Sequence, residues 1–251
     1  YTAGNTAHGL AVGDFNGDGN LDMAAVNQFS NNASVSFGVG NGTFGTPFVT
    51  AMGNQPYFVV ADDFNGDGID DIAASNFENN TVTVRTGAAS GTFSSASSFA
   101  TGNGSVSQAA TGVWYMTTGD LNNDGNRDLI TSNIRHDFVS VLLGDGNGAF
   151  GAPIQVSVGP AGATSLPHQV GPYGVVVKDF NNDGNEDVAV AVWGANAVRI
   201  LTGNGTGVLA VGNSYTVGTS PRGLSAGDFN NDGKVDLAVV NSGAGEDSLH
   251  V

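Results

Sequence analysis

The nonapeptide Asp14-Phe-Asn-Gly-Asp-Gly-Asn-Leu-Asp22 decides how the rest of this sequence is interpreted. It recurs at 63–71, 120–128, 179–187 and 228–236, and successive copies begin 49, 57, 59 and 49 residues apart. Each copy reads Asp-(Phe/Leu)-Asn-(Gly/Asn)-Asp-Gly-x-x-Asp. Five such copies in a chain of 251 residues indicate an internally repeated protein, so the repeat has to be explained first.

Each copy of the nonapeptide carries the oxygen donors of a cation-binding loop. Positions 1, 3, 5 and 9 offer carboxylate or amide oxygens, and position 6 is always glycine. Position 7 includes Ile69 and Lys234, so only its backbone carbonyl can serve in every copy. This spacing is that of an EF-hand loop closed early by an aspartate, and flexible oxygen donors suit Ca²⁺ better than Mg²⁺. We therefore expect about five Ca²⁺ per chain. The expected ligands are Asp14, Asn16, Asp18, Asn20, Asp22, Asp63, Asn65, Asp67, Ile69, Asp71, Asp120, Asn122, Asp124, Asn126, Asp128, Asp179, Asn181, Asp183, Asn185, Asp187, Asp228, Asn230, Asp232, Lys234 and Asp236.

The alternative is that these segments are turns without a metal, because Asp, Asn and Gly all favour turns. Repetition argues against it, since a metal-free turn gains nothing from three clustered like charges. Position 4 is Gly or Asn in every copy, and these residues tolerate a positive φ. We expect the backbone to use that freedom there.

The charge of the chain has the same explanation. Asp and Glu number 23 against 7 Lys and Arg, which gives a net charge of −16, and 15 of the acids lie in the five loops. Five Ca²⁺ would reduce the net charge to −6, an ordinary value for a soluble domain. An acidic chain is a poor match for nucleic acid, and no apolar run reaches the length of a membrane span. We expect neither nucleic-acid binding nor membrane insertion.

The sequence around the loops predicts short strands. In the first unit, strand-like segments at 10–13 and 21–26 flank the loop, and further segments follow at 33–37 and 48–50. A Gly-rich turn ending in an apolar residue separates the last two segments in each of the first four units. These turn-ending residues are Phe44, Phe93, Phe150 and Val208. Four strands per roughly 50 residues, without helical periodicity, predict an all-β propeller of four-stranded blades.

The units resemble FG-GAP/VCBS repeats, the blades of the integrin α-subunit head and of many secreted proteins. The resemblance rests on Phe44-Gly-Thr-Pro47, on Phe150-Gly-Ala-Pro153 and on the five loops, and it covers essentially the whole chain. It implies a propeller in which each loop joins the first and second strands of a blade and holds Ca²⁺ on one rim. The fourth unit departs from the pattern, with Val208-Leu209 where the others have Phe.

The two ends of the chain predict how the propeller closes. Tyr1–Gly4 matches the fourth strand at Tyr215–Gly218, and Ser248–Val251 matches a third strand. We expect residues 1–251 to form a single domain of five blades, in which the N-terminal strand completes the last blade. The alternative is that the chain is part of a longer array.

A ring of large side chains is expected at the opposite rim, because one lies six residues before each loop. These residues are His8, Tyr57, Trp114, Tyr173 and Arg222. They could stack on sugar rings or hold a peptide, or they could simply plug the wide end of a small propeller. Weaker candidates for a contact surface are Phe29, Phe77, Arg135, His136 and Trp193. The expanded connections 101–112 and 159–171 belong to the same rim, where repeat folds often carry function.

Nothing in the sequence predicts catalysis. It has no G-x-S-x-G or H-E-x-x-H motif, and its four His residues are scattered. We expect a non-enzymatic, Ca²⁺-stabilised, lectin-like or adhesion module that recognises a glycan or a surface protein. Weak Ca²⁺ sites fill only where Ca²⁺ is abundant, so the expected location is extracellular, either secreted or at the cell surface. The alternatives are an architectural unit of a surface filament or multidomain adhesin, with self-assembly, and a non-catalytic domain of a secreted enzyme.

Overall fold

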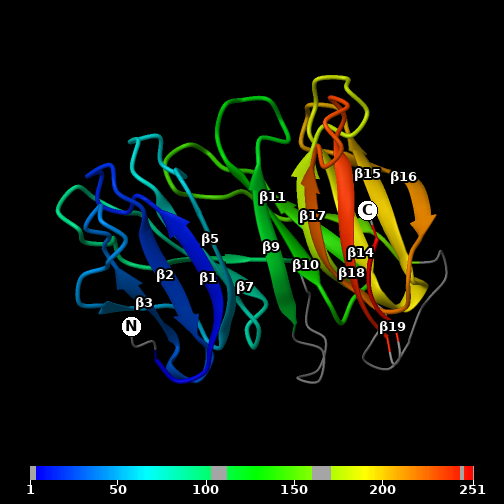
Figure 1. The fold of residues 1–251 in the computed structure, drawn as a ribbon. Coiled ribbons are helices and arrows are strands. Elements are labelled where there is room, and N and C mark those ends of the chain that lie inside the picture. Colours follow the sequence, from blue (N-terminus) through cyan, green and yellow to red (C-terminus); the bar gives the residue numbers. More distant parts are fainter. Residues whose placement is uncertain (1–3, 103–111, 160–170, 244–245, 251) are drawn as a thin grey trace.

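The computed structural model describes residues 4–102, 112–159, 171–243 and 246–250, and for 246–250 only the backbone. Its strands form five antiparallel sheets in chain order (Figure 1). The first sheet contains β1 (Ala7–Gly13), β2 (Asp22–Asn27), β3 (Asn32–Ser36) and β4 (Phe48–Ala51), and the second contains β5 (Pro56–Asp62), β6 (Asp71–Asn76), β7 (Thr81–Arg85) and β8 (Ser97–Ala100). The third contains β9 (Val113–Gly119), β10 (Asp128–Asn133), β11 (Phe138–Leu142) and β12 (Ile154–Ser157), and the fourth contains β13 (Pro172–Lys178), β14 (Asp187–Val192), β15 (Ala197–Gly203) and β16 (Leu209–Thr216).

The fifth sheet has three strands within the described residues: β17 (Pro221–Gly227), β18 (Asp236–Gly243) and β19 (Glu246–His250). Each sheet is a meander in which successive strands pair, as expected for a propeller blade. Single turns of 3₁₀ helix follow β2 and β14, at Gln28–Ser30 and Trp193–Ala195. The all-β, four-stranded-blade architecture predicted from the repeat is therefore confirmed.

Asparagines in a left-handed conformation form the turns between the second and third strands. Asn31, Asn80 and Asn196 have φ of 55°, 51° and 50°. Each side-chain oxygen accepts a hydrogen bond from a backbone N–H just before the first strand of the next blade, at 2.8–3.0 Å. The same asparagine therefore forms the turn within one blade and, through its side chain, binds the start of the next blade.

The hydrophobic core is divided among the boundaries between blades. One cluster joins the first and second sheets around Phe15, Val35 and Ile72, and a second joins the second and third sheets around Phe64, Val84 and Leu129. Among the described residues, a third cluster joins the third and fourth sheets and has twelve buried members, whereas the cluster between the fourth and fifth sheets has four, with more partly buried residues packed against it. Each blade is thus stabilised mainly by its neighbours, as in other repeat proteins.

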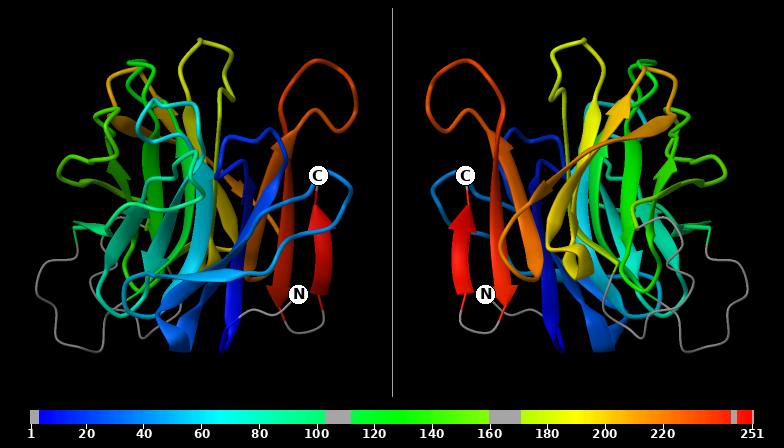
Figure 2. Two further views of the ribbon diagram at one scale, coloured as in Figure 1. Left: turned by 90° about the vertical axis from the view of Figure 1, so that its left-hand side faces the viewer. Right: turned by 90° about the vertical axis from the view of Figure 1, so that its right-hand side faces the viewer.

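The first strands line the inside of the assembly in the order β1, β5, β9, β13, β17, and each packs against the next. β17 and β1 do not pack on one another in this way, and Figure 1 shows the first and fifth sheets on opposite sides of the molecule. Figure 2 shows the same assembly from its two sides. The predicted closing strand, Tyr1–Gly4, lies outside the described residues except for Gly4.

Gly4 donates its backbone N–H to the side-chain oxygen of Asn27 in the first blade at 2.8 Å. Its position corresponds to that of Gly53, which lies against Asn76 of the second blade. Gly4 therefore lies against the first blade as Gly53 lies against the second.

Candidate functional site

The five Asp-rich loops all lie on one rim of the molecule. Each connects the first strand of a blade to the second, and these connections form the upper edge in Figure 1. Position 4 has a positive φ in every loop, from 56° at Asn123 to 74° at Gly66, and position 6 has φ between 81° and 85°. The expected use of Gly and Asn at position 4 is confirmed.

Within a loop, the side chains at positions 1, 3 and 5 fold onto the loop backbone. Asp14 accepts hydrogen bonds from the N–H groups of Asp18 and Gly19, at 3.1 and 2.7 Å. Asn16 accepts from the N–H of Asp18 at 2.9 Å, and Asp18 accepts from that of Asn20 at 2.8 Å. The other four loops repeat these bonds. Three hard oxygen donors are therefore held around the interior of each loop.

Position 9 has a structural role that the sequence reasoning missed. The Asp22 carboxylate is fully buried and accepts from the N–H of Phe15 at 2.9 Å and from that of Gly38 at 2.7 Å. Asp71, Asp128 and Asp187 make the same pair of bonds in the next three blades. Position 9 thus ties the loop to the turn that follows the third strand. The sequence does contain a signal for this role, because in each of the first four units a glycine follows position 9 at a constant spacing of 16 residues.

The position-9 carboxylates carry a charge that is poorly compensated. Burial raises the pKa of Asp71 to about 7 and that of Asp128 to about 6, and the other two aspartates of each loop act in the same direction. Burial, with a smaller contribution from the neighbouring aspartates, also raises the pKa of Asp22 and Asp187. A bound cation would offset the free-energy cost of keeping these buried carboxylates charged.

The donor set fits Ca²⁺, although the carboxylates do not form a preassembled cluster. Among the described residues, no three His, Asp or Glu side chains form a group that could hold a metal. In the first four loops both oxygens of position 9 are engaged by backbone N–H groups. Cation binding would have to draw on the inward-facing oxygens of positions 1, 3 and 5 and the carbonyl of position 7. All are oxygen donors of the kind that Ca²⁺ prefers. In the fifth loop the ammonium of Lys234 lies 3.9 Å from Asp232.

Acids at position 8 connect neighbouring loops on this rim. The Asp70 carboxylate accepts the backbone N–H of Asp14 at 2.8 Å, and Glu186 accepts that of Asp120 at 2.6 Å. Between the second and third blades, Arg127 pairs with Asp62 at 3.1 Å. The loops are therefore braced against each other as well as by their own blades.

The opposite rim contains a small cavity at the start of the first strands. Its volume is about 190 Å³, and its lining includes all five side chains of the predicted ring. The lining residues are His8, Tyr57, Phe58, Trp114, Tyr115, Tyr173 and Arg222. The repeat therefore places one large side chain from each blade at a common opening.

The rings at this opening form a continuous series of contacts. His8 stacks on Tyr57 at 4.2 Å between centroids, Tyr57 meets Trp114 edge-on at 4.5 Å, and Trp114 lies 5.7 Å from Tyr173. The Arg222 guanidinium lies 5.3 Å from the centre of the Tyr173 ring. Burial raises the pKa of both tyrosines, so their hydroxyls stay protonated at neutral pH.

The weaker candidates lie around this series. Trp193 is 6.3 Å from Tyr173 but does not line the cavity, and Phe77 contacts Trp114 edge-on at 5.9 Å. Arg135 lies over the Phe77 ring at 5.4 Å. His136 is near Phe138, and Phe29 is exposed. Most of the two expanded connections, 103–111 and 160–170, lies outside the described residues.

The five consecutive meanders, four of four strands and a fifth of three strands in the described residues, define a β-propeller with one loop rim and one rim cavity. The FG-GAP-like repeat model matches residues 14–74, 63–131, 120–190 and 179–239, and the chain belongs to this family. No curated protein matches the sequence. No helix in the described part of the chain is long and apolar enough to cross a membrane.

Several solved structures share the fold. A lectin from Agrocybe aegerita, described as recognising non-reducing terminal N-acetylglucosamine, has a TM-score of 0.63 at 17% identity, over 94% of this chain and 61% of its own. BBS1N in complex with ARL6DN gives 0.64 at 13% identity, over 96% and 64%. A streptogramin B lyase gives 0.58 at 17% identity, over 92% and 61%. This chain thus spans less than two thirds of each of these chains, and the likeness extends to the fold alone.

Proposed function

We propose that this chain is a calcium-stabilised, non-catalytic binding module that works outside cells and recognises a glycan or a surface protein through the rim cavity. The observation that carries the proposal is the convergence of His8, Tyr57, Trp114, Tyr173 and Arg222, one from each blade, on a single opening. The lectin and the BBS1N complex indicate that this fold can serve both kinds of recognition.

The cavity has the chemistry of a site for one ring-sized group. Its volume of about 190 Å³ is below the roughly 300–1,000 Å³ of drug-sized sites. Aromatic faces can stack on the apolar face of a sugar, while Arg222 and the tyrosine hydroxyls can hydrogen-bond to its polar substituents. Arg222 is also one of only 7 basic residues in the chain, so it favours a ligand with a carboxylate or another acceptor.

Calcium would be held by the five loops through the oxygen donors at positions 1, 3, 5 and 7, while in the first four loops the carboxylate at position 9 stays bonded to backbone N–H groups and holds the loop in place. Bound Ca²⁺ would neutralise the clustered aspartates. Weak sites of this type require the high Ca²⁺ concentration found outside cells. Metal analysis after dialysis against millimolar Ca²⁺ should return about five ions per chain, and one ion or none would contradict the proposal.

An architectural role in a surface assembly is the second candidate. It is favoured by an exposed apolar face on the first blade, where Leu10 and Val12 are more than half exposed. The ring side chains also contact each other, which is compatible with side chains that simply fill the wide end of the propeller. Ordered self-assembly without any glycan binding would favour this role.

The deciding experiment is a glycan and matrix-protein array, run with Ca²⁺ and with chelator. We expect Ca²⁺-dependent binding that Trp114→Ala abolishes. Arg222→Ala should weaken binding without affecting the fold, since Arg222 is exposed. Tyr215→Ala, at an exposed aromatic residue on β16, is the control and should leave binding unchanged. Binding that persists in both cavity variants would refute the role of the cavity.

A further inference from the structure

The rim cavity combines an aromatic surface with a single guanidinium. Tyr57, Trp114 and Tyr173, from the second, third and fourth blades, present a continuous series of rings. Arg222 of the fifth blade ends this series and is the one Arg or Lys in the lining. Among the described residues, no aspartate or glutamate lines the cavity. A ligand here would therefore lie against aromatic rings and meet a cation at the end of the series.

The position of Arg222 is set by the packing of β17 against β13. Gly174 directly follows Tyr173, and a Cβ at Gly174 would lie 2.5 Å from the carbonyl oxygen of Arg222. Glycine is required there, because any side chain would collide with the backbone of the neighbouring strand. With the strands this close, the Arg222 guanidinium lies 5.3 Å from the centre of the Tyr173 ring. Arg222 thus belongs to the cavity through direct packing of two adjacent blades.

The second and third blades carry large residues where the fourth has this glycine. Phe58 and Tyr115 follow the ring residues of β5 and β9, and their own rings lie 5.0 Å apart. Both line the cavity and are only partly buried. They enlarge the aromatic surface around Trp114, so the apolar face of a ligand can rest on the second and third blades.

The positive charge of Arg222 acts across the cavity. Burial raises the pKa of Tyr57 and of Tyr173, and the charge of Arg222 opposes this rise at both hydroxyls. Among the described side chains, the ion pairs are formed by Arg127 and Lys234 on the loop rim. The cation at the cavity is therefore available to an anionic group on a ligand.

A carboxylate matches this cation best. A guanidinium presents parallel N–H groups to the two oxygens of a carboxylate, and one positive charge balances one negative charge. A phosphate would bring a charge of about −1.5 to −2 and three acceptor oxygens, more than one guanidinium can satisfy. The loop aspartates, 15 of the 23 acids, lie on the opposite rim, away from an anion bound here.

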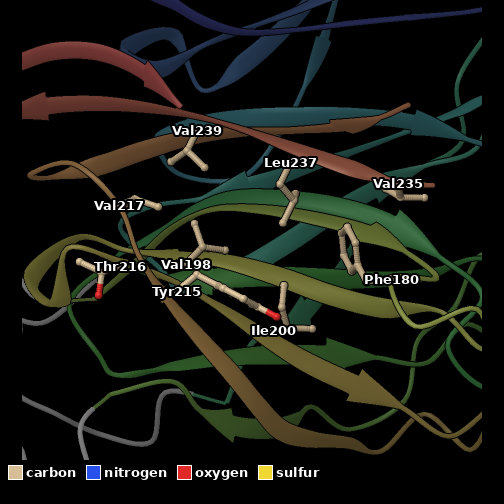
Figure 3. A pocket seen from close by; sticks show the side chains of 9 residues that line it. All are labelled: Phe180, Val198, Ile200, Tyr215, Thr216, Val217, Val235, Leu237 and Val239. Atoms are coloured by element: carbon tan, nitrogen blue, oxygen red, sulfur yellow. The ribbon is translucent and has the colours of Figure 1, made fainter. Parts of the chain in front are cut away.

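The larger cavity between the fourth and fifth blades lacks this combination. Its volume is about 450 Å³, and no Arg, Lys, Asp or Glu lines it (Figure 3). Its one aromatic hydroxyl belongs to Tyr215, which lies among aliphatic side chains such as Val198 and Leu237. Such a lining cannot select an anion, because it offers no charge to offset desolvation of the anion. This cavity therefore provides a control site within the same molecule.

We propose that the rim cavity binds one uronic acid residue at the end of a glycan, with the sugar ring on the aromatic series and the carboxylate on Arg222. The inference rests on the proposed function of the rim cavity and narrows its ligand to one class of sugar. A sugar ring can cover the faces of Tyr57 and Trp114, which an acidic peptide side chain held by Arg222 would leave bare. The tyrosine hydroxyls and His8 can hydrogen-bond to the hydroxyl groups of the ring.

The test compares methyl glucuronide with methyl glucoside, which differ only in a carboxylate against a hydroxymethyl group. Each is titrated into the 251-residue chain in millimolar Ca²⁺ and followed by calorimetry, and a galacturonide and galactoside pair covers the epimeric sugar. We expect one uronide to bind with a Kd on the order of 0.1–1 mM, and its neutral partner at least about tenfold more weakly. Raising NaCl should reduce this preference, because salt screens the charge of Arg222.

Four variants locate the preference. Arg222→Gln should bring the affinities of the two sugars to within about twofold, while Arg222→Lys should keep part of the preference, because it retains the charge without the planar fork. Lys178→Gln removes the same charge from an exposed residue at the loop-rim end of β13 and should leave both affinities unchanged. Tyr215→Ala, in the control cavity, should also leave both unchanged.

Failure of this inference is distinguishable from failure of the proposed function. Equal affinity for uronide and neutral sugar, lost in Trp114→Ala, would overturn the uronic acid assignment and leave a cavity for neutral glycans. A preference that survives Arg222→Gln, or no saturation by either uronide at about 20 mM, would also overturn it. Tighter binding of a sulfated glucose would identify a sulfate as the anion, and equal binding of an acetylated Asp-Gly peptide would identify an acidic protein. Both results contradict the proposal.

Discussion

The first and second blades have nearly the same sequence pattern but very different exposure. Four residues before the loop, Val59 of the second blade is 2% exposed, whereas Leu10 of the first blade is 57% exposed. A similar contrast occurs at loop position 2, where Phe15 is fully buried and Phe229 of the fifth blade is 49% exposed. A residue of this repeat is therefore buried by the adjacent blade rather than by its own sheet.

The contrast indicates where the stability resides. In a repeat protein, stability is approximately the sum of intrinsic repeat terms and nearest-neighbour interfaces. The inner blades have two such interfaces, whereas within the described residues the first strands of the two terminal blades, β1 and β17, do not pack on each other as the other neighbouring first strands do. Equivalent substitutions should thus have unequal costs, and the loops should be the one stabilising feature common to all blades.

Chelation of Ca²⁺ should have the largest effect, because it acts on inner and terminal blades alike. At a Ca²⁺ concentration about ten times Kd, each of five sites would contribute about 1.4 kcal/mol, or about 7 kcal/mol in total. We expect excess EDTA to lower Tm by about 15–25 °C. Differential scanning calorimetry with and without Ca²⁺ measures this, with Mg²⁺ as the control ion. An unchanged Tm would rule out a stabilising role for calcium.

Truncating the aromatic residue at loop position 2 should have the next largest effect. Phe64 is 2% exposed and packs on Phe150, so Phe64→Ala should lower the free energy of unfolding by about 3–5 kcal/mol. Phe229→Ala, at the equivalent exposed position, should cost less than about 1 kcal/mol. Urea unfolding of both variants gives the comparison. Equal losses would show that Phe229 is covered in solution, for example by closure of the ring.

Removing a carboxylate that braces a neighbouring loop should have the smallest effect. Asp70→Ala leaves the N–H of Asp14 without its acceptor, which should cost about 1 kcal/mol. Leu21→Ala changes the equivalent position of the first blade, which is 67% exposed, and should stay within about 0.5 kcal/mol. Urea unfolding of the two variants measures the difference in their free energies of unfolding. A larger loss for Leu21→Ala than for Asp70→Ala would mean that the first blade has a neighbour in solution.

Much of the fold could be predicted because the repeat is local. The loop motif, the strands around it and the left-handed Gly or Asn at position 4 all depend on short stretches of sequence, and the family match agrees. Converging side chains at the rim followed from counting six residues back from each loop. By contrast, the structural role of the buried Asp22 carboxylate depends on the distant N–H of Gly38. The burial of Leu209 in the fourth unit likewise depends on the preceding blade.

The sequence by itself determined the class of fold, the number of repeats and the oxygen donors of each loop, because these are properties of single repeat units. Only the tertiary structure decided which apolar residues are buried, because burial depends on the presence of the next blade. Leu209 fills a boundary, while Phe180 and Leu237 line a cavity at the next one. Equivalent positions in a repeat therefore have the same local conformation but different energies, according to what packs against them.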